Sequence, residues 1–275
     1  MRGIIRAHMS RDPRTALLAC ADAPDGDLAE AALWLAAEDN PGLDPTPWLA
    51  VLDELGEELR TRTNGDGPAF TAVPVMAALL RDRLRLRGAG GGDPQAHYLH
   101  TVIARGAGIP IACGALWIAV GRRAGLAVEG IGLPGHFVVR VGSTLVDAFH
   151  GGEPLDQEAA RQLVSSVVGT EVDSLDPTWL QPSTLRAILA RMSRNLRGCH
   201  AAREDWARAL LAADRCVALQ PGSAGELRDR GLLRWRVGQA QGALADLNAY
   251  LEAAAEADDA GEVRDVVGRL RAFLN

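Results

Sequence analysis

Apolar residues recur at helical intervals of three and four along the first third of the chain. In the clearest case they form one stripe between Asp27, which can cap the start of a helix, and Pro41, which ends it. The pattern predicts helices that begin at Thr15 and that span residues 27–41, 45–62 and 73–87. We therefore expect residues 1–94 to form a helical region that packs on the core of the protein.

The middle of the chain combines one very apolar helix with short strands. Residues 111–126 are apolar on almost every side over their first ten positions, which is typical of a central, buried helix. Beyond this helix the apolar period changes from 3.6 to 2, which predicts a small antiparallel sheet. Residues 154–195 then return to a helical pattern. We expect an α+β core over residues 95–182.

The last part of the chain repeats itself. Residues 204–221 and 237–254 align at an offset of 34, which places Ala209 over Ala243 and Cys216 over Tyr250. A helix-turn-helix period of 34 residues is typical of tetratricopeptide repeats, although two ordinary helical hairpins would give a similar pattern. Two such units are too few to stand alone. We expect a helical tail over residues 183–275 that docks on the preceding domain and offers a groove to a protein or peptide partner.

Composition narrows the classes of function. The net charge is −6 and the pI is near 5.6, so no nucleic-acid partner is expected. Four cysteines are too few for a disulfide framework in a chain of 275 residues, which indicates a reducing cytoplasm. No apolar run approaches the roughly 18 residues of a membrane span. The apolar stretch that follows Thr15 is also too short for a signal peptide. A cytoplasmic protein without a membrane partner is therefore expected.

A histidine and an aspartate fall on one predicted hairpin. A two-residue turn at Gly142 and Ser143 pairs Val139 with Val146, and Gly at the first turn position suits type II′. In that register His136 and Asp147 are diagonal neighbours on one face, so the carboxylate can orient the imidazole. A register slip of one residue would place them on opposite faces.

A cysteine lies at the start of the central apolar helix. Pro110 suits the first helical position, so Cys113 falls in the opening turn, where the positive end of the helix dipole favours a thiolate. Together with His136 and Asp147 it would form a Cys-His-Asp set for acyl transfer, in which the imidazole deprotonates the thiol. The competing interpretation is that Cys113 is a small core hydrophobe.

The remaining histidines and glycines carry weaker signals. His97 and His100 have the i, i+3 spacing of metal ligands, but no cluster of carboxylates or cysteines accompanies them. His150 follows the second strand of the hairpin and is expected near His136. The glycine-rich residues 87–94 follow a helix rather than a strand, so they are not a dinucleotide fingerprint. No cofactor and no metal site are predicted.

Several motifs together resemble a known bacterial family. GIPI at 108–111, PGHF at 134–137 and D-x-F-x-GG at 147–152 are specific in combination, and ELRDRGLLRW extends the match into the repeats. The chain resembles the transglutaminase-like proteins with C-terminal tetratricopeptide repeats that are named after a Salmonella invasion regulator. The resemblance implies a cysteine-protease-like α+β core, in which a central helix carries the nucleophile position and an antiparallel sheet carries the histidine and the aspartate.

The resemblance also assigns site residues. It matches His136 and Asp147 to the family's histidine and aspartate and places Gly135 of the PGH motif at the site. The residue after GIPI is commonly serine in the family, but Ala112 stands here, and Cys113 comes one position later, about 100° further around the helix. Asparagine is usual where His150 stands and also near His100, and these two side chains are expected to line the site.

The sequence is compatible with three functions. The first is a thiol acyltransferase or amide hydrolase that uses Cys113, His136 and Asp147 on an amide or acyl substrate, with backbone N–H groups at the start of the helix as oxyanion donors. The second is a non-catalytic, regulatory interaction protein whose repeats bind a partner. The third is acid–base chemistry by His136, His150 and Asp147 without a thiol.

Overall fold

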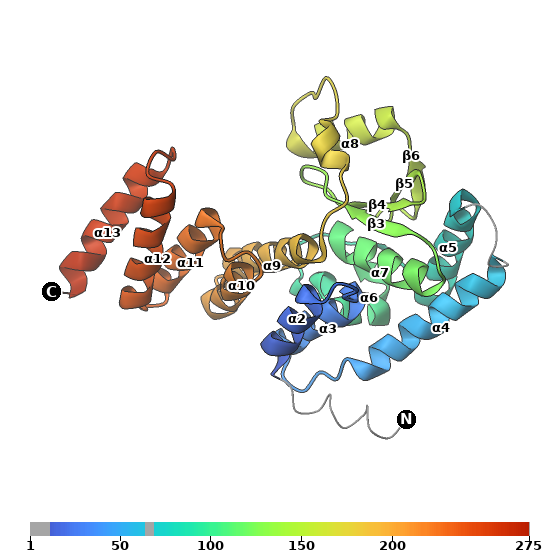
Figure 1. The fold of residues 1–275 in the computed structure, drawn as a ribbon, viewed down its shortest axis with the longest axis horizontal. Coiled ribbons are helices and arrows are strands. Elements are labelled where there is room, and N and C mark those ends of the chain that lie inside the picture. The colour runs from blue at the N-terminus through green and yellow to red at the C-terminus, as the bar shows by residue number, and fades with distance from the viewer. Residues whose placement is uncertain (1–11, 64–68, 275) are drawn as a thin grey trace. The chain divides into compact units, whose positions relative to one another are not determined.

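The computed structural model describes residues 12–63 and 69–274, and it divides the chain into two compact units. Unit 1 is Met1–Leu189 and unit 2 is Ala190–Asn275. Figure 1 shows the helices and the small sheet of unit 1 and the stacked helices of unit 2. Among the described helices, none has both the length and the apolar character that crossing a bilayer requires.

Unit 1 begins with helices close to those that the apolar spacing predicts. They are α2 (Pro13–Asp22), α3 (Leu28–Asp39), α4 (Thr46–Arg62), α5 (Ala69–Leu84), the 3-10 turn η1 (Pro94–His97), and α6 (Leu99–Arg105). The Asp27 side chain accepts a hydrogen bond from the backbone N–H of Ala29 at 2.8 Å, so the predicted cap of α3 is confirmed. The predicted end of the 73–87 helix is wrong, because Arg85 adopts a left-handed φ of 57° and the chain then becomes a strand.

Helix α7 (Pro110–Arg123) is the centre of unit 1. Every residue from Ile111 to Gly121 is buried, which confirms the prediction of a central helix. One face of α7 packs directly on the sheet at Gly114, where a Cβ atom would lie 2.6 Å from Cδ1 of Phe137. The helix can approach the strands this closely because glycine has no side chain at that point.

The sheet consists of β3 (Val128–Ile131), β4 (Val138–Val141), β5 (Thr144–Asp147) and β6 (Glu153–Leu155), antiparallel and in that order. Val139 pairs with Val146, so the predicted register of the hairpin is confirmed. Gly142 has φ of +60°, as the first central position of a type II′ turn requires. Strand β6 was predicted as the start of a helical stretch. It is a three-residue strand, too short for its period to be read from the sequence.

One further feature of unit 1 lies outside the sequence predictions, and another falls in the predicted helical stretch of residues 154–195. Strands β1 (Arg87–Gly88) and β2 (Ala107–Gly108) form a short parallel pair. Helix α8 (Gln157–Val168) and the 3-10 turn η2 (Pro177–Leu180) follow the sheet. Ala160 and Val164 of α8 pack with Ile131 and Val138 in a second, smaller apolar cluster.

Unit 2 is built from helices that repeat at the predicted period. They are α9 (Leu185–Ala202), which begins in unit 1, α10 (Trp206–Leu219), α11 (Ala224–Arg236), α12 (Ala240–Ala253) and α13 (Ala260–Leu274). Helices α10 and α12 begin 34 residues apart, at 206 and 240. The aligned residues Cys216 and Tyr250 are both buried, as are Ala209 and Ala243. The predicted repeat is therefore present in the structure.

Candidate functional site

The turn before β4 presents the histidine of the PGHF motif. The backbone N–H of His136 donates to the carbonyl oxygen of Leu133 at 3.2 Å, and Gly135 has φ of +68°. Proline followed by a left-handed glycine is the sequence of a type II turn. A Cβ atom on Gly135 would also lie 2.2 Å from Val167. The turn brings His136 to the start of the strand, where 4% of the residue is exposed.

Asp147, the last residue of β5, binds the imidazole of His136. Nε2 of His136 lies 3.2 Å from Oδ1 and 3.1 Å from Oδ2 of the carboxylate. The contact that the hairpin register predicts is therefore present. The backbone N–H groups of Phe149 and His150 donate to Oδ1 at 2.9 Å and 3.3 Å, and they fix the orientation of the carboxylate.

A second imidazole reaches the same carboxylate. Nδ1 of His150 lies 2.8 Å from Oδ2 of Asp147, and the rings of His136 and His150 are nearly parallel with centroids 5.9 Å apart. The side chain of His150 is 55% exposed, whereas those of His136 and Asp147 are 5% and 3% exposed. The site therefore has a buried pair and one imidazole that reaches solvent.

The carboxylate at this site is ionised at neutral pH. Burial raises the pKa of Asp147, but the hydrogen bonds with His136 and His150 outweigh burial and lower the pKa to about 2. Each of the three residues also offers one ligand atom within 4.8 Å of the others, so this group could hold a metal ion. The arrangement can orient an imidazole for proton transfer or bind a cation.

The thiol of Cys113 contacts the backbone of the β1–β2 pair. It donates to the carbonyl oxygen of Gly108 at 3.3 Å and lies 3.9 Å from the carbonyl oxygen of Arg87, both in the β1–β2 pair. The residue is fully buried. Burial, followed by the negative charge of Asp147, raises the pKa of the thiol to about 12. Since Gly114 faces the sheet, the face that bears Cys113 is about 100° away around the helix.

The structure also places the other predicted site residues. Ala112 is fully buried in α7, and Gly135 forms the turn beside His136. The ring of His100 lies against Trp48 at 5.7 Å and Tyr98 at 5.8 Å, in the helical part of unit 1. Burial, and then the positive charge of Arg105, lower the pKa of His100.

The backbone carbonyl that accepts the hydrogen bond of the Cys113 thiol was not predicted from the sequence. The strands β1 and β2 are two residues each, so no period could indicate that Gly108 lies beside Cys113. Phe149 was also not predicted at the site, and its ring packs edge-on against both His136 and His150 at centroid distances of 5.8 Å and 4.8 Å. The D-x-F-x-GG motif, in which Phe149 stands, was the available signal.

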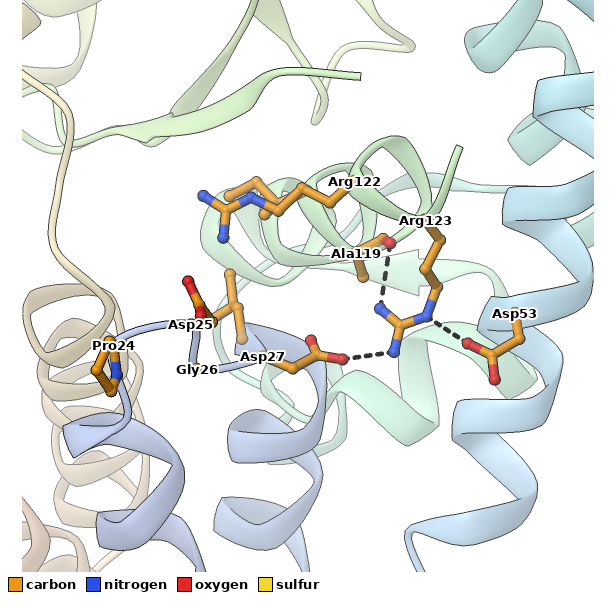
Figure 2. Close-up of a pocket in the computed structure, with 10 residues that line it drawn as sticks. Pro24, Asp25, Gly26, Asp27, Asp53, Ala119, Arg122 and Arg123 are labelled. Carbon is orange, nitrogen blue, oxygen red and sulfur yellow. Dashed lines mark hydrogen bonds and ion pairs between the residues drawn. The ribbon is translucent and has the colours of Figure 1, made fainter. Parts of the chain in front are cut away.

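A separate cavity of about 510 Å³ lies between the loop before α3 and the end of α7 (Figure 2). Figure 2 shows Arg123 between two carboxylates. Its guanidinium donates to Asp27 at 2.6 Å, to Asp53 at 2.7 Å and to the carbonyl oxygen of Ala119 at 3.2 Å. All three nitrogens thus contact protein groups, so Arg123 joins α7 to α4 and to the start of α3.

Comparison with known proteins agrees with these features. Residues 46–194 match the transglutaminase-like superfamily, and residues 196–268 match a tetratricopeptide repeat family. UPF0162 proteins from two strains of Xylella fastidiosa are each 35% identical over 247 residues, which covers 86% of this chain and 86% of the relative.

A UPF0162 protein of Pseudomonas aeruginosa is 32% identical, with 81% of this chain and 83% of the relative covered. Among solved structures, the crystal structure of menin matches with a TM-score of 0.43 and 14% identity, covering 86% of this chain and 68% of the menin chain. The family matches and the bacterial relatives thus cover most of the sequence. The chain belongs to the transglutaminase-like superfamily and carries tetratricopeptide repeats after its transglutaminase-like domain.

Proposed function

We propose that this protein is a regulatory interaction protein whose tetratricopeptide repeats bind a partner, with the transglutaminase-like domain as a scaffold. Such repeats generally mediate protein interactions. The observation that carries the proposal is an exposed aromatic contact in unit 2. Phe273 of α13 is 68% exposed, and its ring packs edge-on against Trp235 of α11 at 5.7 Å.

Two other apolar side chains of the same helices are also exposed. Leu232 of α11 and Leu274 of α13 are 38% and 40% exposed. Exposed apolar side chains on neighbouring elements are typical of interaction surfaces, and aromatic side chains often supply most of the binding free energy. The expected partner is a protein segment that presents apolar side chains.

Substitution of the exposed phenylalanine tests partner binding. The wild-type protein is first used to capture its partner from a bacterial lysate by crosslinking and affinity purification. The affinities of the full-length wild type and of Phe273→Asp for the purified partner are then compared. We expect at least about a 30-fold loss of affinity, because an aromatic interface residue contributes about 2 kcal/mol or more.

The matched control for this experiment is Phe70→Asp. Phe70 is similarly exposed, at 62%, but it lies in α5 of unit 1. This variant should bind the partner as tightly as wild type does. Equal binding by Phe273→Asp and wild type, or equal losses in both variants, would contradict partner binding through the repeats.

The second candidate is acyl transfer or amide hydrolysis by Cys113, His136 and Asp147. The hydrogen bond between Nε2 of His136 and Asp147 favours it, because the carboxylate of a Cys-His-Asp set orients the imidazole in this way. The buried thiol and its pKa of about 12 weigh against it, because the thiolate is the nucleophile. Catalysis would require the thiol to give up its hydrogen bond to the Gly108 carbonyl and to transfer its proton to the imidazole.

Thiol alkylation distinguishes the two candidates. At pH 8 a thiol with a pKa of about 12 is ionised roughly 1,000-fold less than an ordinary thiol, so the buried Cys113 should react much more slowly than the half-buried Cys20. Mass spectrometry of the native protein after iodoacetamide pulses measures both rates. Faster labelling of Cys113 than of Cys20 would instead favour the acyl-transfer candidate. Activity lost in His136→Ala but kept in Cys113→Ala would indicate acid–base chemistry without a thiol.

A further inference from the structure

The three side chains around Asp147 are arranged like the protein ligands of an open metal centre. His136 and His150 approach the same carboxylate oxygen, Oδ2, at 3.1 Å and 2.8 Å, and one ligand atom of each residue lies within 4.8 Å of the others. Two atoms bound to one Zn²⁺-sized ion at about 2.1 Å are roughly 3.0–3.4 Å apart. The separations of Oδ2 from the two imidazole nitrogens are within a few tenths of an ångström of that range.

The surrounding backbone leaves the appropriate oxygen available. Oδ1 of Asp147 accepts hydrogen bonds from the N–H groups of Phe149 and His150 at 2.9 Å and 3.3 Å. Outer hydrogen bonds of this kind orient a ligating carboxylate and are part of most metal sites. Oδ2 is therefore directed at the two imidazoles.

The site is also accessible from solvent on one side. His136 and Asp147 are buried, whereas the side chain of His150 is 55% exposed, so one of the three proposed ligands reaches solvent. Three protein ligands with an open position are typical of catalytic rather than structural zinc sites. Two imidazoles and one carboxylate suit first-row transition metals such as Zn²⁺, Co²⁺ and Fe²⁺, whereas Mg²⁺ and Ca²⁺ prefer oxygen ligands.

We propose that His136, Asp147 and His150 bind one divalent transition-metal ion through Nε2, Oδ2 and Nδ1, respectively. Each imidazole binds in its neutral form, with its proton on the other ring nitrogen. This site differs from the sequence expectation of no metal. It is independent of partner binding by the repeats, and it competes with the acyl-transfer candidate because the ion binds Nε2 of His136 and Oδ2 of Asp147, the two atoms of the hydrogen bond that the candidate uses.

Zinc titration of the full chain tests this site. The background carries Cys20→Ser, which removes a half-buried thiol, and His8→Gln, which removes a histidine outside the described residues. Competition with a chromophoric chelator should give one Zn²⁺ per chain. In the same background, His150→Asn should weaken binding at least about 100-fold, because losing a ligand costs more than losing an outer hydrogen-bond partner, which costs 10–100-fold.

A neighbouring acidic residue provides the matched control. Glu153 is exposed and pairs with Asp147 across β5 and β6, so Glu153→Gln removes a nearby charge without removing a proposed ligand. Its Zn²⁺ affinity should stay within about 3-fold of the background, as expected when a single exposed charge is lost. No uptake of Zn²⁺ by the background, or equal affinities in His150→Asn and the background, would overturn the site.

Cobalt identifies the ligand atoms independently of affinity. Co²⁺ bound by imidazole and carboxylate gives visible d–d absorption without the near-ultraviolet band that a thiolate ligand produces. We expect d–d absorption in the background and its loss in His150→Asn. A thiolate band that disappears in Cys113→Ala would instead place the ion at the cysteine and overturn the assignment.

Discussion

Helix α7 of unit 1 and helix α11 of unit 2 both contact other elements of their own unit, but different groups stabilise them. In α7 the whole run from Ile111 to Gly121 is buried and uncharged. Among the described residues of α11, just Glu226 and Gly231 are buried. Glu226 binds Arg194 at 2.9 Å and Arg197 at 2.5 Å. Apolar packing therefore defines the first helix, and ion pairs contribute to the position of the second.

Another buried carboxylate in unit 2 also binds arginines of a neighbouring helix. Asp246 of α12 is buried and binds Arg230 at 2.6 Å and Arg234 at 2.9 Å, both on α11. Gly231 of α11 lies between these arginines, and a Cβ atom there would be 2.8 Å from Leu247 of α12. The stability of unit 1 should therefore be sensitive to cavities in its apolar core, whereas that of unit 2 should be sensitive to charge and pH.

The largest expected effect is the loss of Phe137 in unit 1. Its ring lies against both Gly114 of α7 and Gly130 of β3, where Cβ atoms would be 2.6 Å away. Phe137→Ala should lower the free energy of unfolding by about 4 kcal/mol, because it leaves a cavity between the helix and the sheet. Denaturant unfolding with hydrogen exchange of unit 1 amides measures the loss. The exposed Phe70→Ala is the control, with an expected change below about 0.5 kcal/mol.

A smaller loss is expected when Glu226 of unit 2 loses its charge. Glu226→Gln should lower the free energy of unfolding of unit 2 by about 2 kcal/mol, because Arg194 and Arg197 both lose their ion pair with its buried carboxylate. Hydrogen exchange of unit 2 amides reports this change. Glu252→Gln, at an exposed position of α12, should change it by less than about 0.5 kcal/mol. Equal effects of the two substitutions would contradict the role of the pair.

The contribution of Glu226 to the free energy of unfolding also depends on pH. Burial raises the pKa of Glu226, but the pairs with Arg194 and Arg197 outweigh burial and hold it below its ordinary value of 4.5. The stabilisation is therefore complete above about pH 4.5 and is lost as pH falls through the lowered, folded-state pKa. The difference in unfolding free energy between wild type and Glu226→Gln should shrink in this acid range.

The smallest expected effect compares one buried thiol from each unit. Cys113 in unit 1 and Cys216 in unit 2 both have a pKa raised to about 12, chiefly by burial. Because the folded-state pKa is above the ordinary value of 9.0, the stabilisation is present below about pH 9 and is lost as pH rises toward 12. Each thiol should therefore lower the free energy of unfolding by about 1.4 kcal/mol between pH 8 and pH 10.

Single substitutions show which unit loses unfolding free energy at alkaline pH because of its thiol. Cys113→Ala should remove the component that belongs to unit 1, and Cys216→Ala the component that belongs to unit 2. Urea unfolding at pH 8 and pH 10, followed by hydrogen exchange, separates the two. An unchanged pH dependence in Cys113→Ala would mean that its thiol ionises readily in the folded protein, which would also revive the acyl-transfer candidate.

Much of the site was predictable because it depends on local patterns. The turn chemistry of Gly142 and the alternation of the two strands determine the hairpin register, and the register places His136 beside Asp147. The second histidine was predicted nearby for the same reason. The direction of Cys113 was not predictable, because it depends on which face of α7 meets the sheet and which meets the β1–β2 pair.

The amino-acid sequence by itself determined the elements that have a period: the apolar helix α7, the β4–β5 hairpin and the 34-residue repeat of α10 and α12. Tertiary structure alone decided that the thiol of Cys113 bonds to the carbonyl of Gly108, and that three side chains converge at Oδ2 of Asp147. The physical reason is that periodicity reports burial along one element. On a fully buried helix, the neighbours of a single side chain depend on which other backbones pack against that face of the helix. The apolar period of the sequence does not indicate this packing.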